Sequence, residues 1–485
     1  MSLPARIRRW ARAGGGPAGT RVGDVQVVST SDGGTPQARA LAAALPADPD
    51  HDVVVADLPP GAGADAWEAV AAALGRGRRP VRLVPGRHPR ELAPDAGRWL
   101  AERLGRAVVA PRGPVHQGAA GALFAHAGAG SGWVRSAPGR EPVWEAKRFP
   151  RPAWESAAFT EVRRFGAVVA EPLPAGVWLR PAGDDDLFAA ARVGLTRAVP
   201  CRPHVPVVVL GCPGAPDLDP ADVAAFRRSL SAPERAAVWF APFGGVARPG
   251  GDEVGQVLAD HLDAEVRCLA GVPVGSPDRP DVRAVRPDGS LGWSPFAQAF
   301  AHLPRRGAEP PPPRLCAHRP PVAGLPEVSP GVHWCAPDTV VEVVRAGLWV
   351  RPAEVAGAAA ARTAPLDPMR NLVLYEAGDP AHVERLRAAA GTLLDRLDGA
   401  TVLVSALLPT TALPLTTGAP AAGPPAAAAE RGDAGSREGG QEGVRSAETV
   451  VLPVPAASPA PGADGRTYSP EEVSAAIRGR LGPGR

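Results

Sequence analysis

The chain has 485 residues, and its 56 glycines and 59 prolines make up about a quarter of them, roughly twice the usual share. A net charge of +3, from 53 basic and 50 acidic residues, is too balanced for a protein that binds nucleic acid over its whole surface. The sequence has no Gly-X-Y or heptad period, which excludes collagen and coiled coil, whereas a hydrophobic content of 45% allows packed cores in about three domains.

Arginine stands in for lysine almost throughout the chain. Lys147 is the only lysine, Asn371 is the only asparagine, and Ile7 and Ile477 are the only isoleucines. Residues with AT-rich codons are rare, while alanine, glycine, proline and arginine are abundant, which is typical of a very GC-rich genome. The arginine content therefore reflects codon usage before it reflects chemistry.

The N-terminus is basic, because five arginines precede the first acidic residue, Asp24. We expect a disordered leader over residues 1–22, with contact to phosphate or to a membrane surface as the alternative. The segment lacks the apolar stretch of a secretory signal. Five cysteines in a long chain imply no disulfide framework, so we expect a cytoplasmic protein, although export by a non-classical route stays open. The uncharged segment 399–429 is interrupted by prolines and predicts no membrane span.

Further along the chain, three stretches open alike and each leads through an alanine-rich helical pattern to a hydrophobic run. The openings are Gly23–Val28, Gly176–Pro181 and Gly347–Pro352, and the runs are Val53–Val55, Val207–Leu210 and Leu372–Tyr375. Short apolar strands that alternate with helical segments are typical of a parallel sheet covered by helices. Continuous valine and leucine runs predict strands that are buried on both faces. The predicted fold class is therefore α/β, with tandem repeated parallel-sheet modules.

These repeats divide the chain into two full modules and one reduced module. The predicted divisions are a basic disordered leader (1–22), module 1 (23–150), module 2 (165–312), a Pro-rich linker (313–337), a reduced module 3 (338–410) and a disordered tail (411–485). The tail ends in a segment that resembles a capped short helix, with Ser469 as N-cap and Pro470 in the first turn. That helix is either a docking peptide or a fraying end.

The residues that follow each hydrophobic run are the candidates for chemistry, because ligands of an open parallel sheet bind beyond the carboxyl ends of its strands. In module 1 these residues include Asp57 and His88, and in module 2 they include Cys212. Cys212 lies in a glycine-rich turn where amides could activate a thiolate, with a buried inert thiol as the alternative. His204 is close in sequence but lies at the other end of the same strand.

Module 1 contains three short motifs, Val81-Arg82-Leu83-Val84, Leu100-Ala101-Glu102-Arg103-Leu104 and Val109-Ala110-Pro111. These motifs resemble the core of caspase-like (clan CD) cysteine peptidases, in particular the versions embedded in large actinobacterial toxin-type proteins. The family's His-Gly is replaced by Asp57-Leu58 and Gly211-Cys212, and its Ser-Cys by Pro85-Gly86 and Ala241-Pro242. A cysteine nucleophile needs a base within hydrogen-bond reach, and neither module keeps the pair. The resemblance therefore implies degenerate copies without peptidase activity.

The linker contains a mirrored pair of potential metal ligands, Cys316-Ala-His318 and His333-Trp-Cys335. Alternate residues of an extended strand point to the same face. If the two strands paired antiparallel, Cys316, His318, His333 and Cys335 would form a tetrahedral zinc site. The alternative is two buried cysteines and two surface histidines in a linker, with no cofactor at all.

We therefore hypothesise a non-enzymatic scaffold or interaction protein, a pseudoenzyme with an unknown protein partner and no catalytic residue. One alternative is a hydrolase or cysteine-dependent enzyme with a site between modules, to which Cys212, His88 or Asp57 contributes. Another alternative, which the charge balance disfavours, is a nucleic-acid adaptor that uses the arginine-rich N-terminus.

Overall fold

Runs of valine and leucine form the buried central strands of three mixed sheets, which confirms the predicted α/β class. The computed structural model describes residues 19–29, 33–59, 61–75, 77–87, 90–92, 95–125, 128, 130–183, 185–248, 251–354 and 359–413. The predicted helix at Ser469, nearly all of the predicted tail and most of the predicted leader lie outside these residues.

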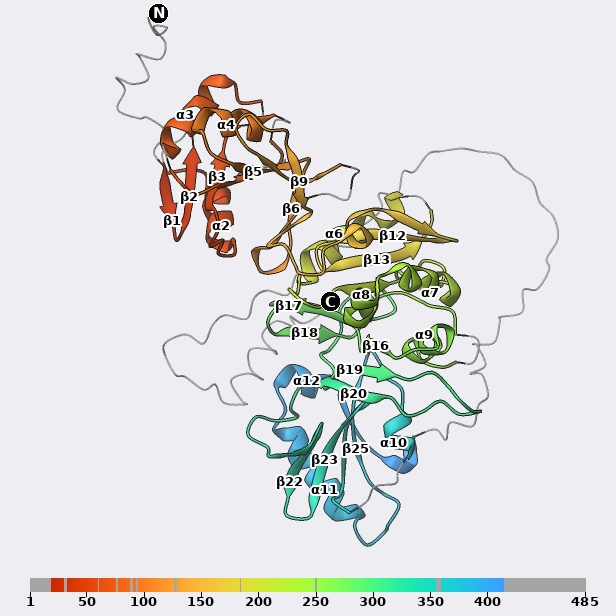
Figure 1. The fold of residues 1–485 in the computed structure, drawn as a ribbon. Helices are drawn as coiled ribbons and strands as arrows, with labels where there is room; N and C mark the ends of the chain where they lie inside the picture. Colours follow the sequence, from red (N-terminus) through yellow and green to blue (C-terminus); the bar gives the residue numbers. More distant parts are fainter. Residues whose placement is uncertain are drawn as a thin grey trace, which may run out of the picture. The chain divides into compact units, whose positions relative to one another are not determined.

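The first sheet, red to orange in Figure 1, has four central parallel strands with antiparallel strands at its edges. Its strands in spatial order are β1 (Thr20–Val22), β2 (Val25–Ser29), β3 (Asp52–Asp57), β4 (Val81–Pro85), β5 (Val108–Arg112), β8 (Gly132–Ser136) and β9 (Val143–Ala146). Helix α2 (Pro36–Ala44) packs in one buried cluster, and α3 (Ala64–Leu74) and α4 (Ala96–Leu104) pack in another. The side chain of Thr35 caps α2 by accepting from the backbone N–H of Ala38.

A small three-stranded sheet takes its strands from segments before and after β8 and β9 of the first sheet. It consists of β6 (Val115–Gln117), β7 (Leu123–Ala125) and β10 (Arg148–Phe149), with a 3₁₀ turn, η1 (Ala119–Gly121), between β6 and β7. Helix α5 (Ala157–Thr160) comes next and leads into the second large sheet.

The second large sheet, yellow to green in Figure 1, has parallel central strands and two antiparallel strands at each edge. In spatial order its strands are β11 (Arg163–Phe165), β12 (Val168–Leu173), β13 (Gly176–Pro181), β14 (Val207–Leu210), β15 (Trp239–Pro242), β16 (Val266–Leu269), β19 (Ala297–His302) and β20 (Arg314–His318). Helix α6 (Asp185–Ala198) packs in one buried cluster, and α7 (Pro220–Ser229) and α9 (Val254–Leu262) in another. The remaining elements are α8 (Ala232–Ala237) and the hairpin of β17 (Val272–Gly275) and β18 (Pro280–Arg283).

The third large sheet, cyan to blue in Figure 1, is shorter and has three parallel strands, β24 to β26. In spatial order its strands are β21 (Glu327–Ser329), β22 (Val332–Ala336), β23 (Thr339–Val344), β24 (Gly347–Pro352), β25 (Asn371–Tyr375) and β26 (Ser405–Pro409). Helices α10 (Ala359–Thr363) and α11 (Val383–Asp395) belong to different buried clusters. The described chain ends after α12 (Gly399–Leu403) and a 3₁₀ turn, η2 (Thr410–Ala412).

Two segments that the sequence analysis placed outside the modules contain strands. Residues 20–22 of the predicted leader form β1, which pairs antiparallel with β2. The predicted linker over 313–337 contains three strands, of which β20 belongs to the second sheet and β21 and β22 belong to the third. These segments add edge strands to the sheets, where each obtains backbone hydrogen bonds from a neighbouring strand.

Gly176 and Gly347 hold the same place in the second and third sheets. Each opens the second strand of a hairpin, with φ of +152° and +147°, and an added Cβ would lie 2.2 Å from the carbonyl oxygen of Val207 or Leu372. Only glycine fits there. In the first sheet that place is taken by Val25, which pairs with Val22, and Gly23 lies in the turn before it. The sequence analysis aligned Gly23 with Gly176 and Gly347, so its alignment of the first repeat is displaced by two residues.

A buried ion cluster of one glutamate and two arginines occurs in both the second and third sheets. In the second sheet, Glu171 of β12 binds Arg180 of β13, with Nε to Oε2 at 2.8 Å, and Arg192 of α6. In the third sheet, the Nε of Arg351 and of Arg362 lie 2.8 and 2.6 Å from oxygens of Glu342. Both clusters use the arginine of the Trp-x-Arg-Pro segments on which the predicted repeat rests.

Replacing either central carboxylate is expected to destabilise the protein, because one buried arginine (Arg180 or Arg351) and one partly exposed arginine (Arg192 or Arg362) would lose their counter-charge. We predict that Glu171→Gln and Glu342→Gln each lower the free energy of unfolding by about 3–5 kcal/mol. Glu68→Gln removes the exposed pair with Arg103 and serves as the control, with an expected loss below about 1 kcal/mol. Urea-unfolding curves measure all three, and equal effects in the three variants would contradict the structural role.

Candidate functional site

Asp57 ends β3, at the edge of the first sheet where a ligand was expected, and its carboxylate is fully buried. Its Oδ2 accepts from Ser29 Oγ at 3.0 Å and from the Thr35 backbone N–H at 2.6 Å. Its Oδ1 accepts from Thr35 Oγ1 at 3.1 Å and from Arg87 Nε at 2.7 Å. Burial alone would raise the pKa of Asp57, but the hydrogen bonds from Thr35 and Arg87 outweigh it and the pKa is lowered. The carboxylate therefore fastens three segments of this chain together.

Cys212 follows β14 at the equivalent edge of the second sheet, in a turn that leaves little space. Gly211 has φ of +72°, and a Cβ added to Gly244 would lie 2.1 Å from the backbone nitrogen of Cys212. Burial raises the pKa of the Cys212 thiol, so the thiolate is disfavoured. His204 is exposed before the start of β14, whereas Cys212 follows its end, so the strand separates the two side chains. The other candidate, His88, lies outside the described residues.

Lys147, the only lysine, makes a buried contact with a serine. Its Nζ donates to Ser131 Oγ at 2.8 Å and to the carbonyl oxygen of Gly128 at 3.1 Å. Ser131 Oγ itself donates to the Gly128 carbonyl at 2.7 Å. A neutral amine beside a hydroxyl can act as a general base, but the serine proton here is directed at a backbone carbonyl and both side chains are buried. The contact fastens the glycine-rich loop to the end of β9.

The structure brings together only two of the four predicted zinc ligands, the histidines. The strands that carry them do not pair with each other, because β20 pairs with β19 and β22 pairs with β21 and β23. His318 and His333 lie close together, with ring centroids 5.9 Å apart. Cys335 Sγ contacts the carbonyl oxygen of Thr339 at 3.3 Å, and Cys316 Sγ contacts that of Arg314 at 3.6 Å.

Glu327 completes the group that the two histidines begin. Its Oε1 lies 3.1 Å from His318 Nε2 and accepts from the Gly331 backbone N–H at 2.9 Å. Ligand atoms of His318, Glu327 and His333 all lie within 4.8 Å of one another, and in the described part of the chain they form the one cluster of metal-ligating side chains. The hydrogen bond from Gly331, and then the nearby histidines, lower the pKa of Glu327.

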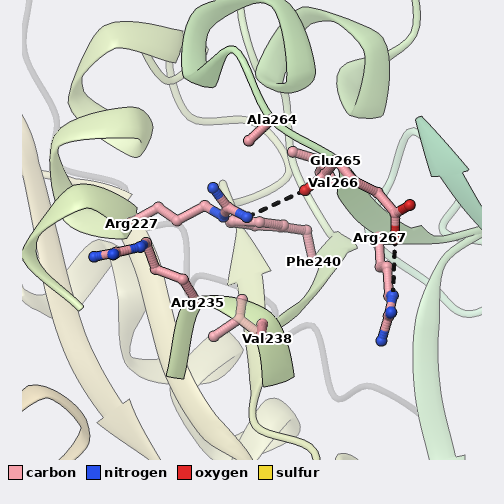
Figure 2. Close-up of a pocket in the computed structure, with 9 residues that line it drawn as sticks. Arg227, Arg235, Val238, Phe240, Ala264, Glu265, Val266 and Arg267 are labelled. Carbon is pink, nitrogen blue, oxygen red and sulfur yellow. Dashed lines mark hydrogen bonds and ion pairs between the residues drawn. The ribbon is translucent and has the colours of Figure 1, made fainter. Parts of the chain in front are cut away.

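A cavity of about 270 Å³ lies at the amino ends of β15 and β16, the edge opposite to the one that the sequence analysis favoured (Figure 2). It is lined by Arg227, Arg235, Ala236, Val238, Phe240, Ala264, Glu265, Val266 and Arg267. Figure 2 shows Arg227 donating to the carbonyl oxygen of Glu265, at 3.1 Å, and Arg267 paired with the Glu265 carboxylate, at 3.3 Å. Burial, and then the charge of Arg235, lower the pKa of Arg227. The lining thus has three guanidinium groups and one carboxylate.

Comparisons with known proteins give no relative from which a function could be transferred. No family model, no curated protein and no solved structure matches the chain. Among the described residues, none of the helices is both long enough and apolar enough to cross a membrane. The functional argument therefore rests on the side chains themselves.

Three features of these sites escaped the sequence analysis. Glu327 lies in a Pro-rich segment, where a single glutamate carries no pattern. The cavity arginines come from separate elements and are hidden among the many arginines of the chain. Lys147 did carry a signal, because it is the only lysine of an arginine-rich chain and lysine and arginine are not interchangeable at buried sites.

Burial lowers the pKa of Lys147 to about 8, which a single-signal experiment can test. Protein grown with lysine labelled with ¹³C at Cε gives one resonance, whose titration we predict to be centred near pH 8. The same signal in urea-unfolded protein should titrate near the ordinary value of about 10.4.

The unfolded chain then binds more protons than the folded chain between these two values, so stability is expected to rise as the pH increases from about 8 to about 10. A folded-state midpoint above pH 10 would contradict the buried position of Lys147.

Proposed function

We propose that the chain is a non-enzymatic interaction protein, built of catalytically degenerate α/β modules, that binds an acidic segment of a protein partner. The observation that carries this proposal is the contrast between the two edges of the second sheet. Its carboxyl edge is filled by the packed turns around Gly211 and Gly244, whereas its amino edge has an arginine-lined cavity.

The loss of peptidase chemistry is supported by the residues at the strand ends. In the caspase-like arrangement that the motifs resemble, histidine and cysteine would follow neighbouring strands. Here Asp57 ends β3 and Pro85 ends β4, while Cys212 follows β14 and Ala241-Pro242 ends β15. Cys212 is buried, its pKa is raised, and the strand β14 lies between it and His204. A nucleophile without a base within reach gains no activation.

The partner chemistry follows from the charge of the cavity. Arg227, Arg235 and Arg267 outnumber the one carboxylate, Glu265, and guanidinium groups bind carboxylates through paired, charge-assisted hydrogen bonds. A volume of about 270 Å³ is suited to one or two side chains rather than to a large cofactor. The near-neutral net charge of the chain favours a local acidic contact on a protein over a phosphate backbone.

The thiol of Cys212 provides the test against an enzymatic function. We predict that iodoacetamide at neutral pH modifies Cys212 more slowly in the folded protein than in the urea-unfolded chain, because the folded thiol is buried and largely protonated. Mass spectrometry of the modified peptides measures both rates, and Cys212→Ser confirms the assignment. Rapid, selective modification of Cys212 in the folded protein would overturn the proposal and favour the hydrolase.

The cavity provides the test of the interaction itself. A fluorescent hexaglutamate peptide is expected to bind the full chain in a salt-dependent manner, and Arg235→Glu should weaken it about tenfold or more, because one charge-assisted contact becomes a repulsion. Fluorescence anisotropy measures the affinity, and circular dichroism confirms that the variant folds.

Arg140→Glu is the matched control, since it makes the same charge change at an exposed residue of the first module. Equal weakening by the two variants, or no binding by the unaltered chain, would contradict a specific acidic-segment site.

A further inference from the structure

The end of the second sheet and the beginning of the third bring together three side chains that ligate metals. His318 ends β20, the edge strand of the second sheet, while Glu327 of β21 and His333 of β22 belong to the third sheet. The ligand atoms of all three lie within 4.8 Å of one another. The cluster therefore joins two sheets whose backbones do not pair with each other at this point.

His333 is buried in this cluster, and its ring nitrogens have no hydrogen-bond partner among the described residues. Its side chain is only 3% exposed. A buried polar group without a partner lowers the free energy of unfolding, because the folded state loses the hydrogen bonds that the group makes with water in the unfolded chain. By contrast, a neutral imidazole nitrogen is one of the commonest metal ligands in proteins. A bound cation would satisfy one nitrogen of His333 and remove part of that cost.

Glu327 is placed to contribute a carboxylate oxygen as a metal ligand. Its carboxylate is held by the Gly331 backbone N–H at 2.9 Å and is 45% exposed, so it reaches solvent. Hydrogen bonds from neighbouring groups orient ligating carboxylates in this way. Its Oε1 lies 3.1 Å from His318 Nε2, so the carboxylate is already within reach of one imidazole.

We propose that His318, Glu327 and His333 bind a divalent transition-metal ion, Zn²⁺ in the first instance, that fastens β20 to the β21–β22 hairpin. Two imidazoles and one carboxylate suit zinc, whereas calcium and magnesium prefer oxygen ligands alone. Three protein ligands leave a fourth position of tetrahedral zinc for water or for a group supplied by a partner. This site shares no residue with the arginine-lined cavity and does not include Cys212. The metal proposal can therefore be wrong while the proposed function is right, and the reverse.

The experiment uses the full chain without a histidine tag. The sequence already has 10 histidines, and a tag would add further metal ligands. Protein stripped with a chelator is titrated with Zn²⁺ by calorimetry, and with Co²⁺ to record its visible absorption. We expect one equivalent to bind and the thermal midpoint to rise on adding Zn²⁺. Absence of stoichiometric binding at micromolar concentrations would overturn the proposal.

Variants identify the ligands. Glu327→Gln changes an exposed side chain, so the protein should fold, and its zinc affinity should fall about tenfold or more; His333→Ala should abolish binding. Cys316→Ala and Cys335→Ala are the matched controls and should leave the affinity unchanged. If the cysteine variants lose zinc while Glu327→Gln retains it, the ligand set is the Cys₂His₂ one and the present proposal is wrong.

Discussion

Arginine side chains carry charge into the interior of this protein, and each buried guanidinium must be bonded to carboxylates or carbonyls. Arg148 shows the constraint most fully, because its side chain is almost completely buried. Its Nη1 donates to Glu155 Oε1 at 2.7 Å, and its other nitrogens donate to backbone carbonyls of β12, of the turn after it and of β13. One guanidinium thereby holds the small sheet of β10 against the β12–β13 hairpin of the second sheet.

The need to pair buried charges also explains the contacts of the carboxylates in the sheets. Asp57 stands where a ligand-binding residue of an α/β protein is expected, but its oxygens are occupied by Ser29, Thr35 and Arg87. Glu171 and Glu342 are occupied in the same way by pairs of arginines. Asp57, which the sequence analysis named as a candidate for chemistry, therefore holds segments together, as the two glutamates do. The two binding sites that we propose, the arginine-lined cavity and the His318–Glu327–His333 cluster, lie away from these ion pairs.

The sequence predicted the fold class and the central strands well, because runs such as Val53–Val55 and Val207–Leu210 are continuous, apolar and bounded by turns. It did not predict β1, and it considered strands in the linker only as partners of each other, because the pairing of such strands depends on distant segments rather than on their own composition. The sequence did not predict which charges pair either. Asp57 and Arg87 are 30 residues apart, and any of 53 basic residues could have been the partner of Asp57. Of the four predicted metal ligands, the two histidines were brought together, and Glu327 joined them through the fold rather than through a motif.

The central claim is that polar groups at the strand ends fasten this chain instead of acting on a ligand, and Asp57→Asn tests it most directly. The exchange keeps the shape of the side chain and removes the charge that Arg87 requires. The account predicts that urea unfolding shows a loss of about 3 kcal/mol in the free energy of unfolding, as expected when a buried ion pair is broken. Unchanged or increased stability, as is usual when a residue kept for activity is replaced, would contradict it.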